Sequence, residues 1–193
     1  MTNNIKLQEV CKQLHIPVVG TTSWPLPIEA REILQESNPC PFTAADIDER
    51  LIGTTDFMPH SAIVCLFPYH VPHEGPTNLS RYTWATDYHL VVTDYLQRLV
   101  DELKTTAPDA SFSIHCDTSP LADRYMAYLA GLGFYGKNKC FINPTWGSYI
   151  VIGTVLTTLE FESNTPIADT CMGCNRCITS CLGQCLDGNA FNY

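Results

Sequence analysis

Apolar residues recur along the chain with two spacings, one typical of helices and one typical of strands. The spacing predicts a helix over residues 7–14, followed by a short buried strand over 16–20. Apolar positions three and four apart within residues 88–103 predict a long helix that begins at about Thr83. Continuous or alternating apolar runs predict further strands over 62–67, 111–115, 139–142 and 148–157.

Prolines interrupt this pattern and divide the chain into segments. They predict loops around two short helices, near Ile28 to Gln35 and near Ala44 to Leu51. Ser119-Pro120 is expected to begin another helix, because proline is favoured in the first turn. The alternation of elements predicts a layered α/β, or α+β, domain over residues 1–163, with a short ferredoxin-like cysteine segment over 164–193.

Composition and charge fit a folded protein. Hydrophobic residues make up 45 % of the chain and charged residues 16 %, which allows a sizeable core. The formal net charge of −9 gives no support for tRNA or any other nucleic acid as a partner. The N-terminus lacks the features of a signal peptide, and no apolar run is long enough to cross a membrane. We therefore expect a cytoplasmic protein without a membrane partner.

Half of the ten cysteines fall within one short segment near the C-terminus. Cys171, Cys174, Cys177 and Cys181 follow the spacing C-x2-C-x2-C-x3-C, which is the spacing of bacterial ferredoxins. Gaps of this size let the backbone wrap round an iron–sulfur cubane. Zinc sites more often use two separated pairs of ligands. The run therefore predicts a 4Fe–4S cluster, with zinc-bound or free thiols as the alternative.

The end of the cysteine run leaves the fourth ligand open. Leu182 stands where the ferredoxin pattern has proline, and an additional cysteine, Cys185, follows. The fourth ligand is therefore Cys181, Cys185 or a group from elsewhere. In two-cluster modules the fourth cysteine of such a run serves the other cluster. The sequence leaves one or two clusters open.

Five ordered blocks of residues carry a resemblance to a known family. They are Leu79–Tyr82 with Asp87–His89, Asp117–Arg124, Ala130–Asn138, Ile142–Ser148 and the cysteine run. In this order they resemble epoxyqueuosine reductase, a cobalamin-dependent iron–sulfur enzyme that reduces epoxyqueuosine in tRNA. The resemblance implies an oxidoreductase with a cobalamin-binding-type domain, related in architecture to reductive dehalogenases. It also implies tRNA and an electron-donor protein as partners.

The resemblance implies roles for individual residues. Asp117 matches the proton donor to the substrate and also lies at the cobalamin site. The polar residues that match the pocket above the cobalt are Tyr88, His89 and Arg124, and the expected cobalamin contacts are Ser80, Phe141 and Ile152. Cys171, Cys174 and Cys177 match ligands of one cluster, and Cys181 matches a ligand of the cluster nearer the cobalamin. The family's Glu-Arg pair is Asp123-Arg124 here.

A second hypothesis is an electron carrier with a degenerate substrate pocket, which the missing proline after Cys181 would suit. The third is a structural module whose cysteines bind zinc. Removal of an epoxide oxygen requires two electrons and protons, and a carboxylic acid within hydrogen-bond reach can protonate the leaving oxygen. This chemistry favours the reductase hypothesis, in which Asp117 is the acid.

Overall fold

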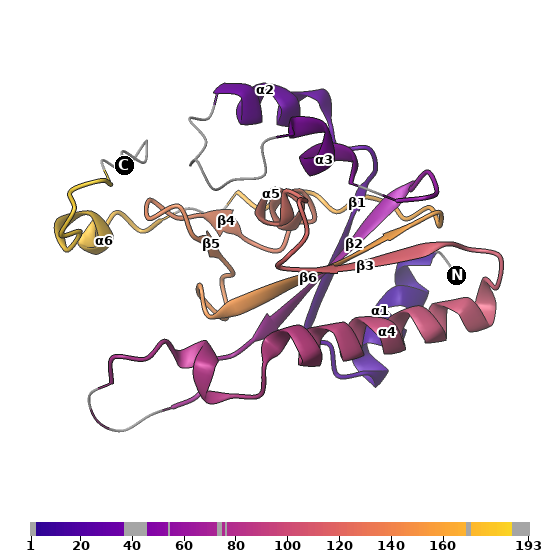
Figure 1. The fold of residues 1–193 in the computed structure, drawn as a ribbon, viewed down its shortest axis with the longest axis horizontal. Coiled ribbons are helices and arrows are strands. Elements are labelled where there is room, and N and C mark those ends of the chain that lie inside the picture. Colours follow the sequence, from indigo (N-terminus) through magenta and orange to yellow (C-terminus); the bar gives the residue numbers. More distant parts are fainter. Residues whose placement is uncertain are drawn as a thin grey trace.

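A four-stranded antiparallel sheet forms the centre of the molecule (Figure 1). The structure is a computed structural model, and it describes residues 3–36, 46–53, 55–72, 75, 77–168 and 171–186. In their spatial order, the strands are β1 (Val18–Ser23), β2 (Ser61–Pro68), β6 (Ile150–Thr157) and β3 (Phe112–Cys116). Each strand runs antiparallel to its neighbours. The expected mixture of helices and strands is confirmed, in an α+β arrangement.

Helices cover both faces of this sheet. The helices on one face are α1 (Asn3–Gln13) and α4 (Tyr88–Thr106), and those on the other are α2 (Ile28–Glu36), α3 (Ile47–Ile52) and α5 (Asp123–Leu129) (Figure 1). Ile63 and Cys65 of β2 pack with α1 and α4, whereas Val64 and Leu66 pack with α5. Burial on both faces explains why this strand is a continuous apolar run and does not alternate.

The long helix begins later than expected. The spacing placed its start near Thr83, but a 3₁₀ helix, η1 (Arg81–Trp84), comes first and α4 begins at Tyr88. The Asp87 side chain caps α4 by accepting a hydrogen bond from the backbone N–H of His89 at 2.9 Å. Such a cap fixes the first turn of a helix, so the two residues after Asp87 have defined positions.

The helix expected at Ser119-Pro120 also begins later, at Asp123. Asp117 has a φ of 57°, a left-handed conformation that no helix can include. The Thr118 N–H donates to the Cys116 carbonyl at 2.7 Å, and residues 117–121, which include Pro120, bend without forming a helix. The loop that follows β3 is therefore longer, and it carries Asp117 outside any regular element.

Shorter elements differ from the expectation at the C-terminal side. The strand expected over 139–142 is a two-residue strand, β5 (Phe141–Ile142), because Lys139 has a φ of 63°. It pairs with β4 (Phe134–Tyr135), which the apolar pattern did not predict. A short helix, α6 (Arg176–Thr179), lies within the cysteine run. Helix α3 begins at Ile47, and the first two residues of the helix expected at 44–51 lie outside the described residues.

The segment after β6 is fastened to the sheet by hydrogen bonds. Asn164 accepts from the Thr21 backbone N–H at 2.7 Å, and its own N–H donates to the Thr21 carbonyl at 2.9 Å. The Thr21 hydroxyl donates to the Glu162 carbonyl at 2.7 Å. In the described part of the chain, no helix combines the length and apolar character required to cross a bilayer.

Candidate functional site

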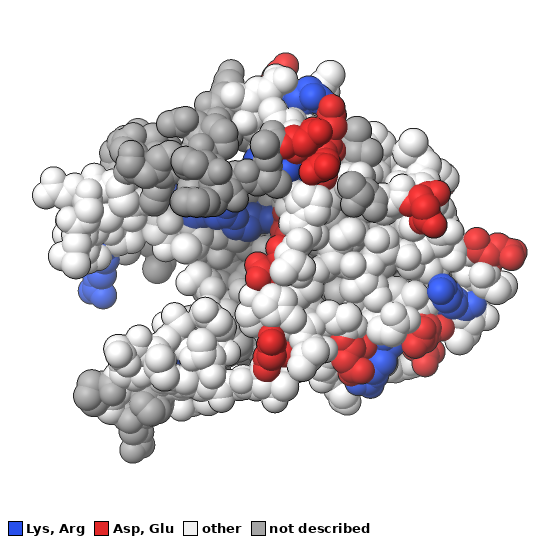
Figure 2. All heavy atoms as spheres, viewed as in Figure 1, with Lys and Arg blue, Asp and Glu red and all other residues white. Residues whose placement is uncertain are grey.

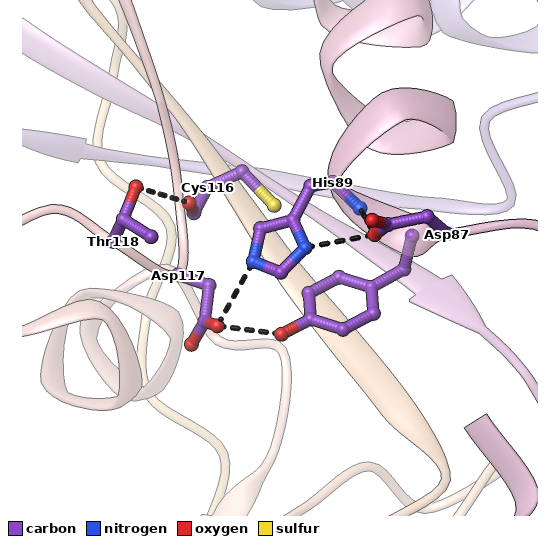
Figure 3. Close-up of polar contacts among 6 residues, drawn as sticks. Asp87, His89, Cys116, Asp117 and Thr118 are labelled. Atoms are coloured by element: carbon purple, nitrogen blue, oxygen red, sulfur yellow. Dashed lines mark hydrogen bonds and ion pairs between the residues drawn. The ribbon is translucent and has the colours of Figure 1, made fainter. Parts of the chain in front are cut away.

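Asp117 lies at the centre of a hydrogen-bonded cluster of polar side chains (Figure 3). The Tyr88 hydroxyl donates to its Oδ2 at 2.5 Å, and the His89 Nε2 lies 3.2 Å from the same oxygen. On the other side of the imidazole, His89 Nδ1 lies 2.8 Å from Asp87 Oδ1. The start of α4 and the loop after β3 thus meet through four side chains, and the two donors converge on one carboxylate oxygen.

The contacts of this cluster shift the pKa values of His89 and Tyr88 upward. The Asp87 carboxylate, and then the Asp117 carboxylate, raise the pKa of His89 by their hydrogen bonds and charge. The hydrogen bond to Asp117, together with partial burial, raises the pKa of Tyr88. Both ring nitrogens of His89 face a carboxylate, which suits the imidazolium because it donates from both nitrogens. His89 is therefore placed to deliver a proton to Asp117, whereas Tyr88 holds its proton more tightly and positions the carboxylate by a hydrogen bond.

Asp117 and Tyr88 border a cavity of about 1050 Å³, which Figure 2 shows as a deep hollow in one side of the molecule. Its lining includes six tyrosines, namely Tyr69, Tyr82, Tyr88, Tyr125, Tyr128 and Tyr135. Small-molecule sites usually enclose about 300–1,000 Å³ and are lined by aromatic and apolar groups. The cavity is therefore of the size and character that a large organic ligand requires.

Strand β6 supplies part of the cavity wall. Its residues 153–157 are buried, whereas Ile150, Val151 and Ile152 are partly exposed and line the cavity. One strand thus anchors the core with its second half and offers an apolar surface to a ligand with its first. Apolar surface of this kind binds the flat face of a large ring by contact area rather than by hydrogen bonds.

Asp123 is a second carboxyl group in the cavity wall. Burial raises its pKa to about 7, the Asp117 charge adds to this, and the Thr154 hydroxyl and Arg124 oppose it. The Thr154 hydroxyl lies 3.4 Å from Asp123 Oδ1. At neutral pH this carboxyl group is consequently protonated in a large fraction of molecules. The cavity thus contains two acids in different environments, an arrangement found where catalysis requires distinct proton donors and acceptors.

The structure brings together some of the expected site residues and not others. Asp117, Tyr88, Arg124 and Ile152 all line the cavity, and His89 touches Asp117 beside it. Phe141, expected at the cofactor, is 4 % exposed and packs in the core with its ring edge against Tyr135.

Ser80 also lies outside the lining. It is exposed, and its carbonyl accepts from the Thr83 N–H and hydroxyl at the start of η1. Arg50 and Lys139, which no motif singled out, do line the cavity.

The cysteine segment contacts the domain through Lys137. The Lys137 backbone N–H lies 3.3 Å from Cys171 Sγ, and its ammonium donates to Asn175 Oδ1 at 2.7 Å. Two tight turns shape the segment, because Gly173 and Asn175 both have positive φ values, 75° and 54°. Cys181 Sγ lies 3.4 Å from Cys185 Sγ, and the hydrogen bond from Cys185 lowers the pKa of the Cys181 thiol.

The donor set fits an iron–sulfur cluster, because five cysteines within residues 171–185 are all free and at least partly exposed. The thiols are not arranged as a preformed cage. Among the described residues, no group of three or more His, Cys, Asp or Glu side chains is positioned to hold a metal ion. Ligand cages commonly assemble only when the metal binds, so the four expected ligands stay a prediction.

The chain was compared with known proteins. Residues 57–118 match the family model described as "Epoxyqueuosine reductase QueG, DUF1730". An epoxyqueuosine reductase of Bacillus cereus is 42 % identical over 101 residues, which are 52 % of this chain and 27 % of that protein. The family-model match, over residues 57–118, includes the start of α4 and Asp117. The chain thus spans about a quarter of the length of this curated relative.

Solved structures extend the similarity over nearly the whole chain. The crystal structure of an epoxyqueuosine reductase with an epoxyqueuosine-modified tRNA-Tyr stem loop has a TM-score of 0.83 and 27 % identity, and covers 98 % of this chain and 54 % of that one. A reductive dehalogenase described as B12-dependent has a TM-score of 0.51 and 15 % identity, over 84 % of this chain and 20 % of that one. The second likeness is one of fold alone.

Proposed function

Because the chain belongs to the epoxyqueuosine reductase family, we propose that its cavity is the site where the epoxide of a tRNA-linked epoxyqueuosine is reduced. The observation that carries this proposal is the convergence of the Tyr88 hydroxyl and the His89 imidazole on one Asp117 oxygen beside the cavity. Protonation of a leaving oxygen requires a positioned acid, and here Tyr88 can position that acid while His89 can resupply its proton.

Reduction of an epoxide requires these residues to supply protons. Conversion of an epoxide into an alkene and water consumes two electrons and two protons. Asp117 gives a proton to the departing oxygen and regains it from the His89 imidazolium, whose Nε2 lies 3.2 Å from its Oδ2. The Tyr88 hydroxyl, 2.5 Å from the same oxygen, holds the carboxylate in position. Asp87 holds the imidazole in place at 2.8 Å. The relay would thus let one carboxyl group act twice within a single reduction.

The cavity also fits the proposed cobalamin. Ile150, Val151 and Ile152 offer an apolar wall, and the tyrosines that line the cavity offer further contact area. When bound there, cobalamin would supply a low-valent cobalt centre that carries electrons to the substrate. Tyr88 and Asp117 would lie at the edge of the same space, where they exclude water and hold the proton.

The proposed source of electrons is the cysteine segment, residues 164–193. Cys171, Cys174, Cys177 and Cys181 would hold a 4Fe–4S cluster, with Cys185 as the other choice for the fourth position. Such a cluster passes electrons one at a time. An electron-donor protein would reduce it, and a second cluster would require ligands beyond this run. A tRNA substrate would place the reaction in the cytoplasm.

The test is an activity assay of the full-length protein with its cofactors and an epoxyqueuosine-containing stem loop. Asp117→Asn should lose about 10²-fold or more in the rate of a single turnover, since a positioned acid typically contributes about 10²–10⁴-fold. Asp109→Asn, in an exposed turn, is the control and should keep the wild-type rate.

Wild-type activity of Asp117→Asn would overturn the role of Asp117. Cluster formation without corrinoid binding or epoxide reduction would favour the electron-carrier hypothesis. Zinc in place of iron, with no visible absorption after anaerobic reconstitution, would favour a structural module.

A further inference from the structure

Three basic residues share one wall of the cavity. Arg50 comes from α3, Arg124 from the first turn of α5, and Lys139 from the turn before β5, and all three line the cavity. Backbone contacts tie them together, because the Ala122 N–H donates to the Arg50 carbonyl at 3.1 Å and Arg124 Nη1 donates to the Lys139 carbonyl at 2.9 Å. Figure 2 shows Lys and Arg atoms along the wall of the hollow.

The two guanidinium groups act on each other and on the same phenol. Burial lowers the pKa of Arg50, and the Arg124 charge lowers it further. Burial raises the pKa of Tyr135 to about 12, and both arginines oppose that shift. The Tyr135 phenol therefore lies within the electrostatic reach of both cations. All three side chains line the cavity, and each can donate a hydrogen bond to a ligand there.

No carboxylate compensates these arginines within the described residues. Arg31 and Arg98 form ion pairs with Asp48 and Asp94, but neither Arg50 nor Arg124 has such a partner in the part of the chain that the structure describes. Asp123 is the carboxyl group next to Arg124 in the sequence, but burial raises its pKa to about 7. It therefore carries only part of a negative charge at neutral pH and neutralises the arginines incompletely. Neighbouring cations without a counter-ion cost free energy, and a bound anion would recover it.

We propose that Arg50, Arg124 and Tyr135 form a subsite for a phosphodiester inside the cavity. Guanidinium groups suit this ligand because their planar donors match the oxygens of a phosphate in pairs. The chain carries a formal net charge of −9, so a local site is needed to attract an anion at all. The inference rests on the proposed function only for the origin of the phosphodiester.

Two molecules could bring this group into the cavity. Cobalamin carries a phosphodiester in its nucleotide loop, and tRNA carries one at every backbone position. Cobinamide lacks the nucleotide loop and its phosphodiester. Its binding therefore reports the contribution of the corrin ring without that of the anion. A stem loop without the epoxide modification keeps the backbone phosphodiesters and lacks the reacting group. Its binding therefore reports the contribution of the tRNA backbone.

The experiment measures binding of cob(II)alamin, cobinamide and an unmodified tRNA stem loop to the wild-type protein, Arg50→Gln and Arg50→Lys. Arg50→Gln should weaken binding of one phosphodiester probe by about 10-fold or more, as expected when a charged hydrogen bond is lost. Arg50→Lys should fall between, because it keeps the charge and loses the paired donors. Arg98→Gln, on the exposed side of α4, is the control. Thermal unfolding of each variant establishes that it is folded.

Weakened cobalamin binding with unchanged cobinamide binding would assign the nucleotide loop, and weakened stem-loop binding would assign the tRNA backbone. Equal loss for cobalamin and cobinamide, no loss for any probe, or no binding of any probe to the wild-type protein would overturn the subsite. Arg50-dependent binding without epoxide reduction would leave the subsite standing while the proposed function fails. Epoxide reduction by a protein whose binding of the probes does not depend on Arg50 would overturn the subsite and leave the proposed function standing.

Discussion

The Asp117 cluster and the cysteine segment are built in opposite ways. Asp117 follows a strand of the central sheet, and its partners begin a 19-residue helix that packs on that sheet. The cysteine segment contains a four-residue helix, and Met172 and Leu182 are fully exposed within it. Asn164 fastens the start of this segment to Thr21, and Lys137 contacts the cysteine run itself through two hydrogen bonds. The first region is held by the fold, and the second lacks a core of its own.

The difference shows where the free energy of each site comes from. A proton relay requires fixed distances, which packed elements provide before any ligand binds. A cluster site can be organised by its cluster, because metal–thiolate bonds supply the free energy that a small segment cannot obtain from burial. We therefore expect cluster loss to disorder the cysteine segment and to leave the Asp117 cluster intact.

The largest expected effect is on iron content. Cys177→Ser should abolish cluster formation, so that the iron content after anaerobic reconstitution falls from about four per cluster to near zero. The control is Cys140→Ser, an exposed cysteine outside the run, which should keep the wild-type iron content. Wild-type iron in Cys177→Ser would exclude this residue as a ligand.

The packed region should be far more sensitive than the cysteine segment to an added methyl group. A Cβ at Gly20 would collide with the Ala130 carbonyl, whereas at Gly183 it would meet only Cys185 Sγ at 3.9 Å. Gly20→Ala should therefore lower the free energy of unfolding by about 1–3 kcal/mol or more. Gly183→Ala should change it by about 0.5 kcal/mol or less. Chemical denaturation of both variants measures the difference, and equal effects would contradict the comparison.

The buried acid of the cavity should make stability depend on pH. The pKa of Asp123 is raised to about 7 in the folded protein, whereas an unfolded chain titrates near about 3.9. Between these values the unfolded state releases its proton first, so this residue reduces stability as the pH rises from about 4 to 7. Asp123→Asn should remove this loss. Its free energy of unfolding, relative to that of the wild-type protein, should rise by about 1 kcal/mol or more between pH 4 and pH 8.

Denaturation at several pH values measures this effect, with Asp109→Asn in an exposed turn as the control. The same pH dependence in Asp123→Asn and in the wild-type protein would show that the carboxyl group is not perturbed.

The smallest expected effect is within the relay. Asp87 is the main cause of the raised pKa of His89, so Asp87→Asn should lower that pKa while it keeps an oxygen to cap α4. Titration of the His89 ring by NMR measures the change. Asp94→Asn, on the same helix but paired with Arg98, should leave the His89 pKa where it was. An unchanged pKa in Asp87→Asn would remove Asp87 from the relay.

The sequence predicted elements with a strong pattern and missed those that depend on single backbone conformations. The runs over 62–67 and 148–157 became β2 and β6 because burial on two faces leaves a clear apolar signal. The start of α5 was wrong because residues 117–121 bend, beginning with the positive φ of Asp117 and including Ser119-Pro120. Such a conformation is set by the tertiary contacts of the residue and not by its neighbours in sequence.

The site follows the same division. Tyr88, Asp117 and Arg124 lie in motif blocks, and all three line the cavity, while their roles stay a prediction. Arg50 lies in α3, far from those blocks, and its approach to Arg124 results from the packing of α3 against the start of α5. The tyrosines that line the cavity could not be separated from core aromatics, because spacing alone does not distinguish a cavity wall from a packed core.

Binding of cob(II)alamin decides whether the cavity is a corrinoid site. Electron paramagnetic resonance should show saturable binding of about one corrinoid per chain of the full-length protein. Ile152→Glu should weaken it by about 10-fold or more, because a charge would face the ring. Leu90→Glu, on an exposed position of α4, should not. Absence of binding in the wild-type protein, or equal affinity in Ile152→Glu, would contradict the account.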